Sequence, residues 1–237
     1  MKVPIAFADR RAAGRALAQV LAGKNFVAPV VLALPRGGVA VASEIAHALK
    51  APLDILLVRK IGVPFQPELA AAAVVDGSEP EIVTNEDVVE LAGVSREYID
   101  AQASRELAEI ERRRRLYVLG RTRESVADRT VILVDDGIAT GASIRAALRA
   151  LKRKAPKALI LAVPVAPAEA VDALRNEVDE VVCLSTPEPF LAIGIHYVDF
   201  HQISDAEVIE LLAQASECAG ADPQNAAAAE TSRPSDG

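Results

Sequence analysis

Short aliphatic segments that do not alternate with polar residues recur along the chain, and Pro, Gly or Asp bounds each of them. An unbroken apolar run suits a strand that is covered on both faces, as in a parallel sheet, because a solvated face would place a polar residue at every second position. The runs predict strands over 28–35, 53–58, 130–135, 158–165 and 180–185.

Helix-like stretches separate these runs. The clearest cover residues 39–50, 142–154 and 168–177. Strands that alternate with helices over short links favour a doubly wound α/β fold with a mostly parallel sheet. The 237 residues are enough for one large domain of this class or for two small ones.

Residues 76–129 interrupt the alternation of strands and helices. Thr84 can cap a short helix that Gly93 interrupts, and Ser95 can cap a second, longer helix with an apolar stripe. We therefore expect a helical insertion, packed on the sheet or on a partner chain.

Two further stretches are polar. The arginine run 112–115 lies among Glu106, Glu109 and Glu111, which favours a solvated helix face over a phosphate clamp or an RNA contact. The tail 215–237 consists of small and polar residues without a period, which predicts disorder.

Composition and charge narrow the class of protein. A net charge of −7 argues against a surface built to bind nucleic acid. Cys183 and Cys218 offer neither a disulfide framework nor a metal-ligand spacing. The sequence starts without a signal-peptide pattern, and no run reaches the roughly 18 apolar residues of a membrane helix. These features favour a cytoplasmic protein without a membrane partner.

The segment VILVDDGIATGAS (131–143) places two aspartates and a loop of small residues directly after an apolar strand. Small residues let backbone N–H groups approach an anion, and the following helix N-terminus adds its positive end. The loop is a candidate phosphate cradle, with the hydroxyls of Thr140 and Ser143 as further donors. Asp135 and Asp136 would repel a bare polyphosphate, but they suit the hydroxyls of a phosphorylated sugar and can attract Mg²⁺.

In order and length this segment resembles the 5-phosphoribosyl 1-diphosphate (PRPP) binding signature of the type I phosphoribosyltransferases. The resemblance implies the fold of that family. It also implies that the two aspartates bind the ribose hydroxyls and, partly through water and the ligand, Mg²⁺, and that 139–143 hold the 5′-phosphate. The PRPP-binding residues implied in this segment are Asp135, Asp136, Gly137, Ala139, Thr140, Gly141, Ala142 and Ser143.

The segment LALPRGGVAVA (32–42) carries Arg36, Gly37 and Gly38 at the end of the first predicted strand. A guanidinium and exposed backbone amides both donate hydrogen bonds to diphosphate oxygens. The segment resembles the diphosphate loop of the same family. By itself it would also suit a Pro-Gly turn with an arginine that faces solvent.

Arg59 and Lys60 follow the second predicted strand in LLVRKIGVP (56–64). Because the carboxyl ends of parallel strands gather at one edge of the sheet, we expect both cations beside Arg36, where they would bind diphosphate. Adenine- and orotate-specific members of the family carry a similar pair. The alternative is a pair of surface cations.

In the family a variable hood recognises the base, and here the N-terminal segment and about 186–214 would form it. Phe190, Tyr197 and Phe200 lie close together in this stretch and are candidates for stacking on a base. Packing of the hood's own core is the alternative. The phosphoribosyltransferase domain would then cover 1–214.

Two positions depart from the usual pattern of the family. Members that use 6-oxopurines often carry Asp where Ala139 stands, which disfavours hypoxanthine and guanine as acceptors. Gly137 replaces a bulky apolar residue and is expected to loosen the turn.

The resemblance implies a Mg²⁺-dependent enzyme of nucleotide metabolism that transfers 5-phosphoribosyl from PRPP to a nitrogenous base and releases diphosphate through an oxocarbenium-like transition state. The alternative is a PRPP-sensing regulator of the same fold with little or no catalysis. Dimers are common in the family, and the helix expected over 96–118 is a candidate contact. The catalytic residues implied are Arg36, Arg59, Lys60, Asp135 and Asp136.

Overall fold

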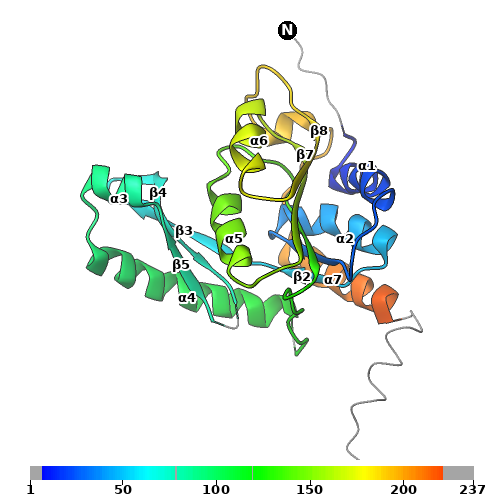
Figure 1. The fold of residues 1–237 in the computed structure, drawn as a ribbon, viewed down its shortest axis with the longest axis horizontal. Helices are drawn as coiled ribbons and strands as arrows, with labels where there is room; N and C mark the ends of the chain where they lie inside the picture. The colour runs from blue at the N-terminus through cyan, green and yellow to red at the C-terminus, as the bar shows by residue number, and fades with distance from the viewer. Residues whose placement is uncertain (1–6, 78, 119, 221–237) are drawn as a thin grey trace, which may run out of the picture.

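The computed structural model describes residues 7–77, 79–118 and 120–220, and within them a central sheet of five strands (Figure 1). The strands stand in the order β2-β1-β6-β7-β8, and each neighbouring pair is parallel. Their bounds are Val30–Ala33 (β1), Leu53–Ile55 (β2), Thr130–Val134 (β6), Ala158–Val165 (β7) and Glu180–Ser185 (β8). The predicted doubly wound α/β fold is thus confirmed.

Helices cover both faces of this sheet. One face carries α1 (Arg10–Ala22), α2 (Gly37–Leu49) and α7 (Asp205–Gly220), and the other carries α5 (Ala142–Lys152) and α6 (Ala168–Arg175). The chain passes from β1 through α2 to β2 on one side and from β6 through α5 to β7 on the other, so the strand order reverses between β1 and β6. Ligands of open α/β sheets bind at such a switch point.

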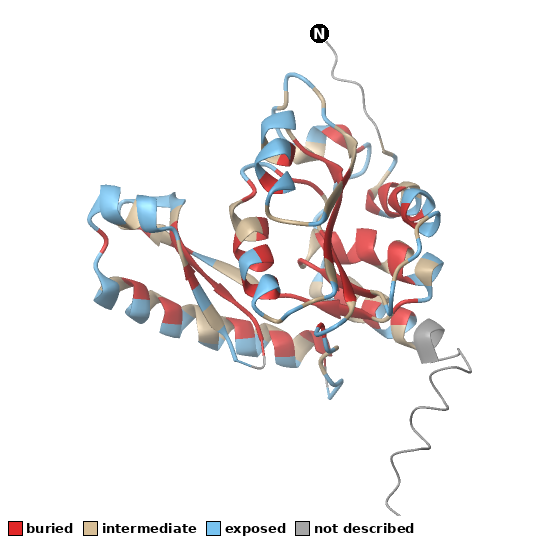
Figure 2. Ribbon diagram, in the orientation of Figure 1, coloured by how far each residue is buried: buried red, intermediate tan, exposed pale blue. Residues whose placement is uncertain are grey.

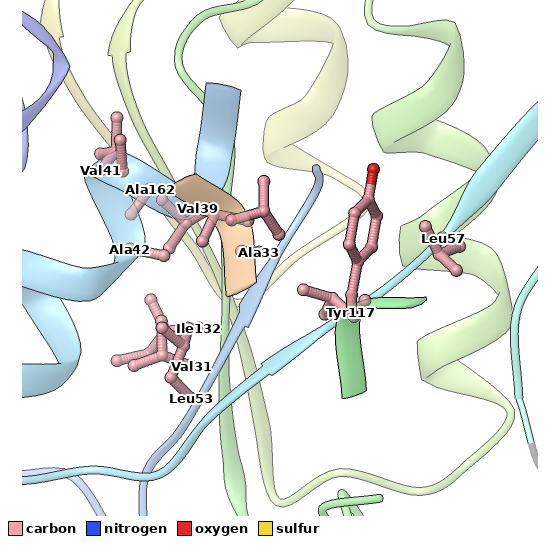
Figure 3. Close-up of a cluster of buried hydrophobic side chains, with 14 of the residues drawn as sticks. Val31, Ala33, Val39, Val41, Ala42, Leu53, Leu57, Tyr117, Ile132 and Ala162 are labelled. Carbon is pink, nitrogen blue, oxygen red and sulfur yellow. The ribbon is translucent and has the colours of Figure 1, made fainter. Parts of the chain in front are cut away.

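Successive strand residues face different helix layers. Val31 and Ile132 belong to the cluster against α1, α2 and α7, part of which Figure 3 shows, whereas Val30 and Val131 belong to the cluster against α5 and α6. All four side chains are fully buried. Because both faces are dry, polar residues are not needed at alternate positions, which explains the unbroken apolar runs in the sequence.

An arm formed by residues 58–118 projects from the central sheet (Figure 1). It contains a second sheet, antiparallel and in the order β3-β4-β5, followed by two helices. The two helices expected in the insertion near residue 76 are present, but the arm begins earlier, at Val58, and also contains three strands. The elements of the arm are β3 (Val58–Val63), β4 (Gln66–Val75), β5 (Glu81–Thr84), α3 (Glu86–Ala92) and α4 (Arg96–Val118).

The run 53–58 predicts a single strand, but in the structure it spans the end of one strand and the start of another. Strand β2 ends at Ile55, and the buried Leu56 and Leu57 form the connection to β3. This connection lies in the interior, so its residues are apolar like those of the strands. The sequence therefore has no polar residues to mark where the strand ends.

The arginine run 112–115 divides between surface and interior. Arg112 and Arg113 pair with Glu109, and Arg115 pairs with Glu111, as a solvated face requires. Figure 2 shows the alternation of buried and exposed turns along α4.

The remaining arginine of this run is buried, contrary to the expectation of a wholly solvated face. The Nη1 of Arg114 donates to Asp76 Oδ2 at 2.7 Å, and its Nη2 lies 3.4 Å from Asp54 Oδ2 in β2. Arg123 also donates to Asp76. These contacts fix the base of the arm to the central sheet.

Helix α7 extends to Gly220, so the prediction of disorder from residue 215 was wrong for 215–220. Ala215 packs in the core with an exposed fraction of 7%. The rest of the tail, 221–237, lies outside the described residues.

None of the described helices combines the length and the apolar character required to cross a membrane.

The N-terminal segment and the late part of the chain meet above the sheet. Phe7 forms a parallel bridge with Tyr197, and the N–H groups of Val198 and Asp199 donate to the carbonyls of Phe7 and Ala8. A short 3-10 helix, Ile193–His196, lies in this region. We call the two stretches 7–10 and 186–204 the hood.

Candidate functional site

The loops after β1 and β6 are neighbours at the carboxyl edge of the sheet. Ala33 and Val134 are partners in the parallel register, and the N–H of Leu34 donates to the carbonyl of Val134 at 2.9 Å. This pairing sets Arg36 beside Asp135 at the point where the strand order reverses. Two of the three predicted segments are therefore brought together.

Two glycines allow the loops to approach each other. A Cβ atom on Gly37 would lie 2.0 Å from Asp136 Oδ2, and one on Gly38 would lie 2.8 Å from the carbonyl oxygen of Val134. Separations below 3.0 Å are not tolerated by real Cβ atoms. A larger residue at Gly38 would push the Arg36 loop away from the backbone of β6, and one at Gly37 would displace either the Asp136 carboxylate or the loop.

Asp135 and Asp136 form a coupled acidic pair. The backbone N–H of Asp136 donates to Asp135 Oδ1 at 2.9 Å. Although Asp135 keeps some exposed surface, desolvation of its carboxylate and the negative charge of Asp136 hold its pKa well above the ordinary value. The pair therefore stores electrostatic repulsion that a cation or hydroxyl donors would relieve.

Arg10 contacts the acidic pair, and sequence reasoning missed it. Its Nε donates to Asp136 Oδ2 at 2.7 Å, and its Nη1 donates to the backbone carbonyl of His201 at 2.8 Å. The guanidinium lies over the ring of Phe200, 3.8 Å from the ring centroid. Only 7% of Arg10 is exposed. In the sequence Arg10 is one of several charged residues at the start of an amphipathic helix. Nothing in that pattern indicates that its side chain contacts Asp136.

Tyr197 is not available for stacking on a base. Its hydroxyl donates to the carbonyl of Asp136 at 2.5 Å, and its ring packs against Phe7 at 5.6 Å and against Phe200 at 5.1 Å between centroids. Its exposed fraction is 4%. Burial raises the pKa of the phenol above its ordinary value, so it remains a donor. Tyr197 is a positioning residue for the loop after β6.

The other two aromatic candidates differ in exposure. Phe200 is 38% exposed, with Arg10 over one face of its ring. Phe190 is part-buried and stacks on His196 with 5.4 Å between ring centroids. Phe200 thus has more free surface for an aromatic ligand.

The phosphate loop, residues 137–143, lies between β6 and α5. Gly141 has a φ of 73° and is the N-cap of α5, where no side chain caps the helix. Ala139 and Thr140 are exposed. The first N–H groups of α5 are thus oriented toward the loop as anion donors.

Gly137 tightens the structure and does not loosen it, contrary to expectation. A Cβ atom at this position would lie 2.6 Å from Ile193 Cγ2 and 3.1 Å from Val165 Cγ1. Absence of a side chain lets the hood pack directly on the loop after β6.

Arg36 is linked to the base of the arm through Asp205. Its Nη1 lies 3.6 Å from Asp205 Oδ1, which accepts a hydrogen bond of 2.6 Å from the hydroxyl of Tyr117. Burial and the bond to Asp205 raise the pKa of Tyr117 to about 12. Helix α4 thereby reaches from the arm to the Arg36 loop.

Arg59 and Lys60 do not both join the site. They lie in β3 of the antiparallel sheet, where neighbouring residues point to opposite faces. Arg59 donates to Glu106 of α4 at 2.6 Å, away from the acidic pair. Lys60 faces the other way and lines a groove with Thr140 of the phosphate loop. The expectation of two cations beside Arg36 was therefore wrong.

The donors at the acidic pair fit Mg²⁺ that is shared with a substrate. Mg²⁺ usually takes one or two carboxylates and completes its shell with water and substrate phosphates. Asp135 and Asp136 supply such carboxylates, although one oxygen of each already accepts a hydrogen bond. Within the described residues, there is no cluster of three acidic, His or Cys side chains that could hold a metal alone.

Comparison with known proteins matches this geometry. Residues 7–197 match the model of the family described as "Phosphoribosyl transferase domain". Two curated proteins from Mycobacterium tuberculosis strains CDC 1551 / Oshkosh and ATCC 25618 / H37Rv, each named "Putative phosphoribosyl transferase", are 46% identical over 209 residues. The alignment covers 88% of this chain and 47% of each relative, so the chain spans about half the length of the curated relatives it matches.

A solved structure extends the likeness to three dimensions. The crystal structure of TT1426 from Thermus thermophilus has a TM-score of 0.78 and 42% sequence identity. The superposition covers 88% of this chain and 98% of that chain.

Proposed function

This chain belongs to the phosphoribosyltransferase family of type I fold, and we propose that it transfers 5-phosphoribosyl from PRPP to a nitrogenous base with release of diphosphate. The observation that carries the proposal is the meeting of Arg36 and its two glycines with Asp135 and Asp136 at the switch point of the sheet. An acidic pair flanked by a phosphate loop and an arginine loop suits a ligand with a phosphate at each end of a ribose.

Each part of the site has one role in this proposal. The phosphate loop binds the 5′-phosphate through the first N–H groups of α5. Asp135 and Asp136 accept hydrogen bonds from the ribose hydroxyls. Arg36 and the adjacent amides bind the diphosphate. The exposed ring of Phe200 is the candidate surface for the base.

The chemistry needs no nucleophilic side chain. Cleavage of the bond between ribose C1 and diphosphate develops positive charge on the ring, as in glycoside hydrolysis. The negative charges of Asp135 and Asp136 favour that charge, and Arg36 stabilises the departing diphosphate. Bound at Asp135, Asp136 and the substrate, Mg²⁺ would supply further neutralisation of the leaving group. Arg10 and Tyr197 keep Asp136 in place.

Titration of PRPP with Mg²⁺ into the protein tests this proposal when it is combined with Asp135→Asn. The variant should lower PRPP affinity by roughly tenfold or more, because a hydrogen bond to a charged group contributes about 1.5–3 kcal/mol. It should also raise the melting temperature, because the amide removes a charge that is disfavoured by burial and by the like charge of Asp136, the two causes that raise the pKa of Asp135. Calorimetry and thermal unfolding measure the two effects.

The exposed Asp172, on α6 away from the site, provides the matched control. Asp172→Asn should leave both quantities unchanged. Absence of PRPP binding to the wild type would contradict the proposal.

The acceptor is tested by diphosphate release with purines, pyrimidines and pyridine carboxylates. We expect diphosphate release with at least one base. The best acceptor should not be a 6-oxopurine, since Ala139 offers no carboxylate. PRPP binding without diphosphate release for any base would favour the PRPP-sensing regulator instead.

A further inference from the structure

A groove separates the arm from α5 and reaches the phosphate loop. Its volume is about 350 Å³. The arm stands opposite α5 in Figure 1. Ala70, Ala72 and Val83 of the arm line one wall, and Ala146 of α5 lines the other. Thr140 and Ala142 of the phosphate loop close one end.

Three cations line this groove. Lys60 comes from β3, and Arg145 and Arg149 come from successive turns of α5. Across the part of the chain that the structure describes, neither Lys60 nor Arg145 forms an ion pair, and the buried Nε of Arg145 has no hydrogen-bond partner. Arg149 lies 3.9 Å from Glu177. Two cations without an ion pair on facing walls of a groove favour an anionic ligand there.

Acidic residues also face the groove but do not cancel these cations. Glu68 and Asp87 belong to the lining, and both are on the arm. Arg145 and Arg149 are on the opposite wall, which carries no lining carboxylate. The positive side is therefore α5, whose N-terminus adds to the same potential.

The groove adjoins the phosphate loop at Thr140 and Ala142, and its lining includes neither Asp135 nor Asp136. Arg145 follows Gly141 by four residues, which places it about 6 Å further along the axis of α5. A phosphate held by the loop would have the acidic pair on its ribose side and Arg145 on its outer side. A second phosphate attached at that position would enter the groove between Arg145 and Lys60.

We propose that the groove binds the outer phosphates of a nucleoside 5′-triphosphate, whose first phosphate lies in the phosphate loop and whose ribose lies at Asp135 and Asp136. Such a nucleotide competes with PRPP for the loop and the acidic pair. The proposal rests on the proposed function, because it takes the loop as the 5′-phosphate site. A groove of about 350 Å³ exceeds what a single phosphate needs.

Competition against PRPP binding tests this assignment with four pairs of probes: AMP and ATP, GMP and GTP, CMP and CTP, and UMP and UTP, each with Mg²⁺. For at least one pair the triphosphate should bind tenfold or more tightly than the monophosphate. Lys60→Met and Arg145→Met should each reduce that ratio to below threefold and change monophosphate affinity little. Both methionines preserve the bulk of the aliphatic stem, so the groove keeps its walls.

Lys152→Met is the control, since Lys152 is on the same helix but pairs with Glu177 at 3.6 Å outside the groove. It should leave the ratio unchanged. Two results overturn the inference while the proposed function stands: PRPP binds but no triphosphate is preferred, or the variants weaken monophosphate and triphosphate equally, which would assign the cations to the 5′-phosphate itself. Failure of PRPP itself to bind would overturn the proposed function as well.

Discussion

Arg10 and Asp136 form a 2.7 Å ion pair that joins the first helix to the acidic pair after β6. The same guanidinium covers Phe200 and binds the carbonyl of His201, so one side chain contacts both the ribose site and the hood of the proposed enzyme. Arg10 is a positioning residue, because its ion pair holds Asp136 in place.

Arg10→Ala should therefore impair both stability and turnover. Loss of a part-buried charged hydrogen bond is expected to cost about 2 kcal/mol of unfolding free energy. The KM for the base should rise together with the KM for PRPP, whereas a purely structural role would leave KM values unchanged in the folded fraction. Arg11→Ala, which removes an exposed partner of Glu44, is the control for both measurements.

Gly37→Ala should abolish PRPP binding while most of the protein remains folded. Its Cβ would lie 2.0 Å from Asp136 Oδ2, so either the Asp136 carboxylate or the Arg36 loop must leave its place in the proposed site. Overpacking of this kind costs about 1–3 kcal/mol. Gly23→Ala, with the nearest atom at 3.9 Å, should change neither property. Wild-type PRPP affinity in the Gly37→Ala variant would contradict the close approach of the two loops.

Arg114→Met should destabilise the protein by about 3–5 kcal/mol, because the buried Asp54 and Asp76 lose their shared partner. Arg112→Met on the same helix removes only an exposed pair and should change the unfolding free energy by less than about 0.5 kcal/mol. Urea denaturation compares the two. Equal effects would show that Arg114 is not the anchor of the arm.

The pKa of His201 should be higher than that of an ordinary histidine. Its ring nitrogens lie 3.0 Å from Glu207 Oε1 and from Asp199 Oδ1, and these hydrogen bonds raise the pKa above 6.5. The contribution to stability is full below pH 6.5 and is lost as the pH rises through the higher folded value. An NMR titration measures this pKa, and Glu207→Gln should bring it back toward 6.5. A wild-type value at or below 6.5 would contradict the bridge.

Much of the fold followed from the sequence because the sheet is buried on both faces. The runs 158–165 and 180–185 match β7 and β8. In β7 dry surroundings on each side select apolar residues at nearly every position, whereas the edge strand β8 is mostly part-buried. The meeting of Arg36 with Asp135 followed from the same logic, because both residues end neighbouring parallel strands.

The arm and the Arg10 contact did not follow from the sequence. Four consecutive alanines in β4 carry no strand preference, and their extended form comes from pairing with β3 and β5. Arg10 and Asp136 are 126 positions apart, and no local pattern records a pair at that separation. Side-chain contacts between remote segments depend on the packed structure and not on the period of the residues around them.

The contacts that hold Asp136 also determine when the site can form during synthesis of the chain. Strand β6 emerges from the ribosome before residue 197, so the carbonyl of Asp136 cannot accept the hydrogen bond of the Tyr197 hydroxyl until that residue has been added. The hydrogen bond from Arg10 Nη1 to the carbonyl of His201 likewise joins an early residue to a late one. The nascent chain can therefore include all strands of its parallel sheet, the last of which ends at Ser185, before the contacts that hold the proposed ribose site are in place.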